Sequence, residues 1–312
     1  MSSDPRWGDD PRDHSSEHVQ RDRNVDRPGP GRGSTTRPHR DRNHPRDVPV
    51  RQVDLPRGPE RETVRDRGRE YTLRGSETRT LATVGSFRVV PTGQLRDHNN
   101  SPLHDRSSDL RHLREQGLIE TARVPGHRDS VVVLTKEGRE LLEHHRAGQG
   151  RPTQTFYAGL KRTRELEHDS QIFDAYLDAA EVLQERGARV DRVVLDYELK
   201  QDYQKWLHEH DGDRDDYDGH PDRTEDEIRA WAAAHDLPYF DDQVHFPDLR
   251  IEYETGRTEY RDVELVTEHY SRGQLGGKTA AGFACYRASG ARGGGGQKGG
   301  TPFDPRHLER LA

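Results

Sequence analysis

Apolar residues recur at helical spacing in two separate parts of the chain. In the first part, Leu81, Val84 and Phe87 fall on one face of a helix predicted over residues 79–87. In the second part, a helix predicted over residues 163–186 ends before Gly187 and carries a longer apolar face, formed by Leu166, Ile172, Phe173, Tyr176, Leu177, Ala180 and Leu183. Each face needs a partner surface to cover it, so the pattern predicts two packed regions.

Two more helices are predicted in the first region. A short one is expected around residues 92–95, and a longer one turns Leu110 and Leu113 inward. Gly117 stands where the left-handed residue that follows a helix is needed. Leu118 can then contact Leu113, as the Schellman ending of a helix requires.

A hairpin and a closing helix complete the first region. Strands are predicted over residues 119–124 and 131–134, joined by a polar turn at residues 125–128. Thr135 is placed to cap the helix that follows. The order helix, helix, helix, hairpin, helix is that of a winged helix-turn-helix. The sequence Asp-Leu-Arg-His-Leu-Arg-Glu-Gln-Gly-Leu-Ile over residues 109–119 resembles winged-helix regulators of the MarR and PadR kind.

This resemblance implies a DNA-binding domain over residues 76–147. A recognition helix needs one face for the core and one for the DNA groove, and Leu110 and Leu113 occupy the core face. The outward candidates for DNA contact are Arg106, Ser108, Arg111, His112 and Arg114, with Arg128 at the tip of the hairpin. Arginine can bind phosphates or guanine edges through two hydrogen bonds. The alternative is a winged helix used for protein contacts, with a solvated charged face.

The second region mixes strands and helices. A strand is predicted over residues 190–195, and Thr224 caps a helix through a capping box with Glu227. Two strands follow over residues 246–254 and 259–267, and a last helix is expected over residues 274–286.

Two carboxylates mark the paired strands. If the hairpin turns at Gly256, Asp248 falls opposite Glu264 to within about one residue, because the residue numbers of antiparallel partners have a constant sum. Two carboxylates at that separation can bind one hard cation such as Mg²⁺, which could activate water at a phosphodiester. Alternatively, both lie on the solvated face of an ordinary half-exposed sheet.

The second region resembles the PD-(D/E)xK nuclease fold through its order of elements, Pro247-Asp248 and Glu264-Leu-Val266. With the winged helix and Leu166-Glu-His-Asp169, it is similar to the replication-relaxation family of plasmids and conjugative elements. The nuclease pattern has lysine where this chain has Val266. In some members the lysine moves to the following helix, where Lys278 is the candidate. The alternatives are a non-catalytic relative that binds DNA or a partner, and an unrelated α/β domain. His168 is interpreted as a structural histidine rather than a catalytic one.

The composition indicates that some regions of the chain do not form a packed core. The chain has 29% hydrophobic and 34% charged residues, which is too polar for 312 residues of compact core. We expect a disordered arm over residues 1–75, a linker at residues 148–152 and a flexible Gly-rich tail over residues 289–312. The net charge of −7 means that any basic surface must be local.

The remaining features bear on location. Cys285 is the single cysteine, so a disulfide framework is excluded. No apolar run approaches the length of a membrane span, and the N-terminus has no apolar core of a signal peptide, so we expect a cytoplasmic protein without a membrane partner.

The sequence therefore predicts an α+β protein with a winged helix over residues 76–147 and a nuclease-like domain over residues 153–288. Double-stranded DNA is the expected partner, and Mg²⁺ is the expected cofactor only if the second domain is catalytic. Winged helices often form homodimers on paired half-sites, although no dimer helix is identifiable. Roles in replication or mobilisation of mobile DNA, DNA cleavage and transcriptional regulation all remain open.

Overall fold

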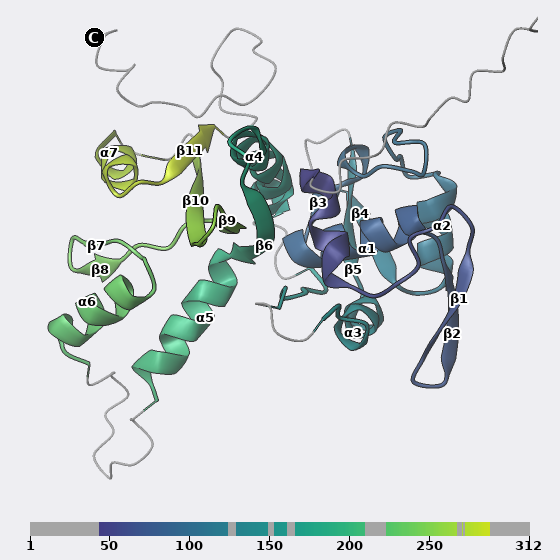
Figure 1. Ribbon diagram of the computed structural model, residues 1–312, viewed down its shortest axis with the longest axis horizontal. Coiled ribbons are helices and arrows are strands. Elements are labelled where there is room, and N and C mark those ends of the chain that lie inside the picture. The colour runs from purple at the N-terminus through teal and green to yellow at the C-terminus, as the bar shows by residue number, and fades with distance from the viewer. Residues whose placement is uncertain are drawn as a thin grey trace, which may run out of the picture. The chain divides into compact units, whose positions relative to one another are not determined.

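The computed structural model describes residues 44–123, 129–148, 153–160, 166–209, 223–266, 270 and 272–287, which form a mixed α+β fold (Figure 1). The predicted Gly-rich tail, most of the predicted linker and residues 1–43 lie outside the described residues. Among the helices that the structure describes, none is both long and apolar enough to cross a bilayer.

The first region contains the elements that the sequence predicts, in the same order, together with one short strand, β3 (Val90–Pro91), that it does not predict. They are α1 (Gly75–Phe87), β3 (Val90–Pro91), the 3-10 helix η3 (Thr92–Gln94), α2 (Ser108–Glu115), β4 (Ile119–Arg123), β5 (Ser130–Leu134) and α3 (Lys136–His144). The expected second helix is thus a single 3-10 turn. The strands form one antiparallel sheet in the order β3-β5-β4.

The ends of these helices follow their predicted caps. Gly117 has φ +73°, and the N–H of Leu118 donates to the carbonyl of Leu113 at 3.0 Å. Thr135 accepts a hydrogen bond from the N–H of Gly138 at the start of α3. The Gly117 ending fixes where α2 stops, and the Thr135 cap fixes where α3 begins.

The arm predicted over residues 1–75 extends too far. Ordered structure is already present in η1 (Pro45–Asp47), η2 (Pro49–Gln52), β1 (Glu62–Asp66) and β2 (Arg69–Leu73). The apolar residues of this segment are few, but the fold buries Val48, Val53 and Leu73. Such sparse residues show no helical period, which is why composition alone suggested an unfolded arm.

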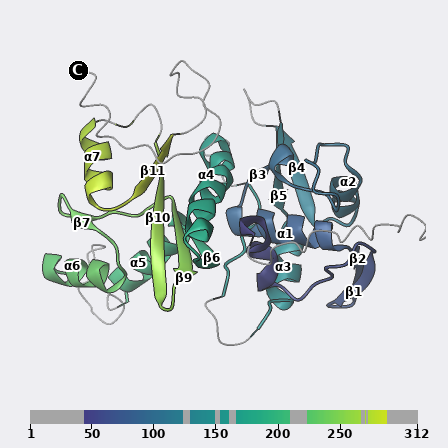
Figure 2. The ribbon, with the colours of Figure 1, turned by 45° about the horizontal axis from the view of Figure 1, so that its top comes forward.

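The second region is a four-stranded sheet with flanking helices. Its elements are α4 (Leu166–Glu185), β6 (Arg189–Leu195), α5 (Asp196–Leu207), α6 (Glu225–Ala234), β7 (Tyr239–Phe240), β8 (Gln243–Val244), β9 (Leu249–Glu254), β10 (Thr258–Val266), α7 (Arg272–Ala280) and β11 (Ala284–Arg287). The strand order is β11-β10-β9-β6, in which β10 and β11 are parallel and the other pairs are antiparallel. Helix α4 packs against β6, β9 and β10, as Figure 2 shows.

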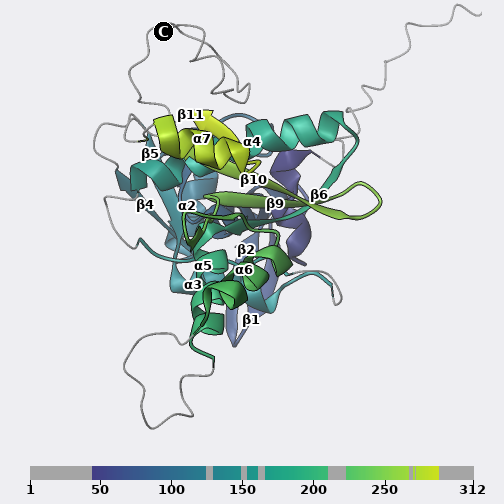
Figure 3. The same ribbon diagram turned by 90° about the vertical axis from the view of Figure 1, so that its left-hand side faces the viewer.

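The structure corrects one prediction for this region and adds elements that were not predicted. The last helix does not run to residue 286, because α7 ends at Ala280 and the chain returns as β11 after Gly282, which has φ +90°. The sequence also gave no prediction of α5 or of the β7–β8 hairpin. Helices α5 and α6 lie side by side (Figure 3) and are joined by aromatic contacts, with the Trp206 and Trp231 rings 5.6 Å apart.

The two regions share one hydrophobic core. The ring of Phe87 at the end of α1 lies 4.9 Å from Phe173 and 4.8 Å from Tyr176, both on α4. Tyr176 is fully buried, and its hydroxyl donates to the carbonyl of Pro45 at 2.8 Å. Helix α4 therefore packs on the sheet of the second region and on the helices of the first at the same time.

Candidate functional site

Asp248 and Glu264 lie opposite each other at the start of β9 and the end of β10. The observed register pairs Val263 with Leu249, so the next pair in the same register is Glu264 with Asp248. Asp248 stands just before β9, where its Oδ2 accepts a hydrogen bond from the N–H of Leu265 at 2.8 Å. The predicted pairing of the two carboxylates is therefore confirmed.

Glu264 is a buried acid on an interior strand. Strand β10 has β9 on one side and β11 on the other, where Glu264 pairs with Cys285, and only 2% of the Glu264 surface is exposed. Burial raises the pKa of Glu264, and the nearby charge of Asp248 raises it further. A buried carboxylate beside a second carboxylate forms a site where a cation is electrostatically favoured.

Lys278 reaches this carboxylate pair from α7. Its Nζ lies 3.0 Å from Glu264 Oε1 and donates to the carbonyl of Phe246 at 3.0 Å. The hydroxyl of Tyr270 also donates to Glu264 Oε1. Strand β10 and helix α7, together with the residue that precedes β9, thus bring Asp248, Glu264 and Lys278 to one place.

His168 joins the site from the first turn of α4. Its Nε2 lies 3.4 Å from Asp248 Oδ2, and its Nδ1 lies 3.5 Å from Asp169 Oδ1. Hydrogen bonds with Asp169 and then Asp248 raise the pKa of His168 to about 10, so the imidazole is a cation at neutral pH. His168 is therefore part of this site, although its spacing on the apolar face of the helix suggested a structural role. Nothing in the sequence indicated Tyr270.

The donor atoms fit a hard divalent cation with few protein ligands. Glu264 Oε2 is buried without a hydrogen-bond partner among the described residues, and Asp248 lies across the strand pair from it. Magnesium commonly binds through one or two carboxylates and keeps water or substrate oxygens as its other ligands. No cluster of three or more His, Cys, Asp or Glu side chains arranged for a metal occurs in the described part of the chain.

The predicted DNA-contacting residues separate into two groups. Arg106, Ser108, Arg111 and Arg114 are exposed on α2 or just before it. Arg111 has 67% of its side chain exposed, and its Nε is 4.0 Å from Glu115 Oε1. Arg114 donates to Thr121 Oγ1 at 3.3 Å and to the carbonyl of Asp105 at 3.1 Å. These long or solvent-exposed contacts are weak and leave the guanidinium groups available to phosphates.

His112 does not belong to this exposed face. Its Nδ1 lies 3.0 Å from Glu77 Oε1 and its Nε2 lies 3.1 Å from Thr72 Oγ1. Strand β2 covers this side of α2, where the Thr72 N–H also donates to Gln116 Oε1. The prediction of an outward His112 is wrong because the β1–β2 hairpin falls in a segment that was expected to be unfolded. Arg128 lies outside the described residues.

No protein-family model, curated protein or solved structure matches this chain. Its function is therefore inferred from its own residues and their geometry.

Proposed function

We propose that the chain is a DNA-binding protein in which a winged helix over residues 76–147 docks on duplex DNA and a PD-(D/E)xK-like domain cleaves it with the help of Mg²⁺. One observation carries the catalytic part of this proposal. Asp248, Glu264 and Lys278 come together although the first two are 16 positions apart in the sequence and the last two 14. A metal-dependent nuclease needs two carboxylates for the cation and a positive charge for the phosphoryl oxygens at one place.

The order of elements supports the fold assignment. In the second region a helix precedes three antiparallel strands, and a further helix leads to a strand parallel to the third. In the first region three helical segments precede a hairpin and a closing helix, with the hairpin joined to a third short strand. These arrangements are compatible with the two resemblances and with the placement of the exposed arginines.

The proposed chemistry divides among the residues of the site. Asp248 and Glu264 would hold Mg²⁺, which when bound supplies Lewis-acid charge and lowers the pKa of a water. The Leu265 N–H fixes Asp248, and the Tyr270 hydroxyl occupies Glu264 Oε1 and leaves Oε2 for the cation. Lys278 keeps a positive charge beside Glu264, where it can stabilise the negative charge that develops on phosphoryl oxygens.

On the DNA-binding side, α2 and the residues just before it offer Arg106, Ser108, Arg111 and Arg114 to the duplex. Phosphate contacts from these arginines would position the protein, and any base contact from Arg111 would provide sequence preference. Because the net charge is −7, such binding depends on this local basic surface and should weaken as salt increases.

A second candidate function is DNA binding without cleavage, as in replication or mobilisation of mobile DNA or in transcriptional regulation. The observation in its favour is that both carboxylates already have cationic neighbours. Lys278 lies beside Glu264, and His168 lies beside Asp248. These ion pairs neutralise the site without a metal, so the same cluster could serve as a purely structural network.

Plasmid cleavage distinguishes the two candidates. Supercoiled plasmid is incubated with the full chain, with and without Mg²⁺ or Mn²⁺, beside Asp248→Ala, Glu264→Gln and Lys278→Met. Arg257→Gln, at the exposed β9–β10 turn, is the matched control. Nicking that needs metal, persists in the control and is lost in the three variants supports the nuclease. Intact plasmid together with a gel shift that Arg111→Ala weakens supports binding alone, and absence of both overturns the proposal.

A further inference from the structure

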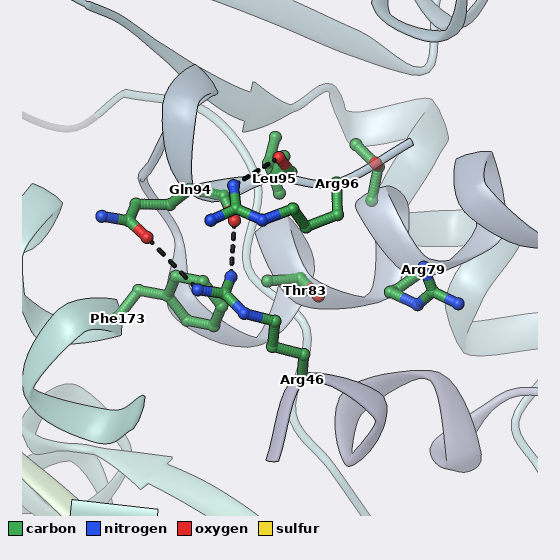
Figure 4. Close-up of a pocket in the computed structure, with 8 residues that line it drawn as sticks. Arg46, Arg79, Thr83, Gln94, Leu95, Arg96 and Phe173 are labelled. Carbon is green, nitrogen blue, oxygen red and sulfur yellow. Dashed lines mark hydrogen bonds between the residues drawn. The ribbon is translucent and has the colours of Figure 1, made fainter. Parts of the chain in front are cut away.

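A pocket lined in part by arginines lies away from the carboxylate site, between α1, the η3 segment, η1 and α4 (Figure 4). The pocket opens to solvent, and its cavity has a volume of about 10 Å³, which is room for roughly one water-sized group. Its described lining residues are Arg46, Arg79, Thr80, Thr83, Gln94, Leu95, Arg96 and Phe173. Three of these eight residues are arginines and none is acidic, so the lining itself carries a strong excess of positive charge.

The arginines are held in place rather than extended into solvent. Arg46 donates to the carbonyl of Gln94 at 2.6 Å, and Arg96 donates to the carbonyls of Gly93 at 2.6 Å and Leu95 at 3.0 Å. Both guanidinium groups are thus fixed by the same strip of backbone, as Figure 4 shows. A guanidinium group that is already ordered loses less conformational entropy when it binds a ligand.

The positive charges of Arg46 and Arg96 repel each other within this pocket. Burial lowers the pKa of Arg46, and the proximity of Arg96 lowers it further. Acidic groups offset this charge from outside the lining: Asp47 pairs with Arg79 at 2.9 Å, and Asp174 and Glu181 act on Arg46 from α4. An anion in the pocket would relieve the remaining repulsion between the arginines.

An unpartnered hydroxyl also lines the pocket. Thr80 is 1% exposed, and its Oγ1 has no hydrogen-bond partner in the described structure. A buried hydroxyl without a partner costs free energy, so a ligand oxygen at this point would stabilise the folded state. Guanidinium groups and hydroxyls together are the donors that bind the oxygens of a phosphate group.

We propose that Arg46, Arg79, Arg96 and Thr80 form a binding site for a single phosphate group. The cavity has room for about one oxygen atom of a ligand and opens to solvent, so it suits an oxyanion that lies at its mouth rather than a whole nucleotide. The site is separate from the carboxylate pair and does not depend on cleavage. The phosphate can come from the solution or from the backbone of bound DNA, since the chemistry of the two is the same.

Calorimetric titration of the full chain with inorganic phosphate tests the site, with chloride at equal ionic strength as the reference. The wild type should bind phosphate with saturation. Arg96→Gln should weaken binding by at least about tenfold, the loss expected for one charge-assisted hydrogen bond. Thr80→Val removes only a hydroxyl that lacks a partner, so it should fold normally and still bind phosphate more weakly. Arg257→Gln should bind as the wild type does.

The result that overturns the proposal is a wild type that binds phosphate no better than chloride, or an Arg96→Gln variant indistinguishable from Arg257→Gln. Duplex DNA binding by the same variants then identifies the source. Unchanged DNA affinity in Arg96→Gln, or no DNA binding by any variant, assigns the site to phosphate from solution. A parallel loss of DNA affinity, with competition by inorganic phosphate, assigns it to the DNA backbone.

Discussion

Lys278 Nζ lies 3.0 Å from Glu264 Oε1, and both side chains are largely withdrawn from water, with 15% and 2% of their surfaces exposed. The lysine offsets a buried negative charge that the neighbouring Asp248 makes less favourable. Removing either partner alone leaves the other charge buried, whereas removing both does not. The stability of the fold and the chemistry of the site are therefore coupled at this pair.

Lys278→Met should destabilise the protein by roughly 3 kcal/mol near pH 8, because Glu264 loses its counter-charge. The pKa of Glu264 then rises further, so the loss grows as pH rises and shrinks in acid, where the carboxyl is protonated. Urea unfolding at several pH values measures this. Adding Glu264→Gln to Lys278→Met should recover much of the stability, and a double variant less stable than the single one would contradict the pairing.

His112→Ala should lower stability and leave DNA affinity nearly unchanged, because the imidazole contacts Glu77 and Thr72 rather than solvent. Glu77 is fully buried, so the loss of one partner should cost about 1–3 kcal/mol. Arg111→Ala is the matched comparison on the same helix, with weaker DNA binding and unchanged stability expected. Chemical denaturation and fluorescence anisotropy with a labelled duplex measure the two effects, and the reverse pattern would place His112 on the DNA face.

Asp174→Asn should stabilise the protein in alkaline more than in acidic solution. Burial and then the charge of Asp178 raise the pKa of Asp174 to about 6, so the folded state binds this proton more tightly than the unfolded state. The free energy of unfolding consequently falls as pH rises from the ordinary aspartate range to about 6. The substitution should therefore gain roughly 1–2 kcal/mol at pH 8, after allowance for partial exposure, and little below the ordinary pKa. Equal gains at both extremes of pH would exclude this cause.

Gly138→Ala should destabilise the first region, because a Cβ at this position would overlap the carbonyl oxygen of Leu118. Backbone atoms cannot move aside cheaply, so a cost of about 1–3 kcal/mol is expected. Gly273→Ala is the control, since it lies in α7 with no atom within 4 Å of the added Cβ. Thermal unfolding should show a lower midpoint for the first variant and an equal or higher midpoint for the second. A lower midpoint for both would point to a general loss on replacing glycine.

The pairing of Asp248 with Glu264 could be predicted because it depends on one local fact. Once the hairpin turns at Gly256, the residue numbers of each pair across it have a constant sum, which sets the register. The alternation of side chains along a strand then determines the face on which each residue lies. Helix ends were predictable for a similar reason. Gly117 and Thr135 carry their capping chemistry within a few residues of the position they cap.

What could not be predicted depends on contacts between distant segments. Thr72 meets His112 across 40 residues of sequence, and Tyr176 meets Pro45 across 131. The hydrophobic periodicity of a helix does not show contacts with distant segments, so His112 was predicted to lie on the outer face. The four residues of β11 are too short to reveal a period, and they were absorbed into the preceding helix.

The packing of Phe87 against Phe173 and Tyr176 has a thermodynamic consequence. Side chains from both regions fill one interior, so neither region can lose its order without exposing apolar surface of the other. The two regions should melt in one cooperative transition. A ligand bound to either of them then stabilises both, and the protein exchanges its buried amide hydrogens as a single unit.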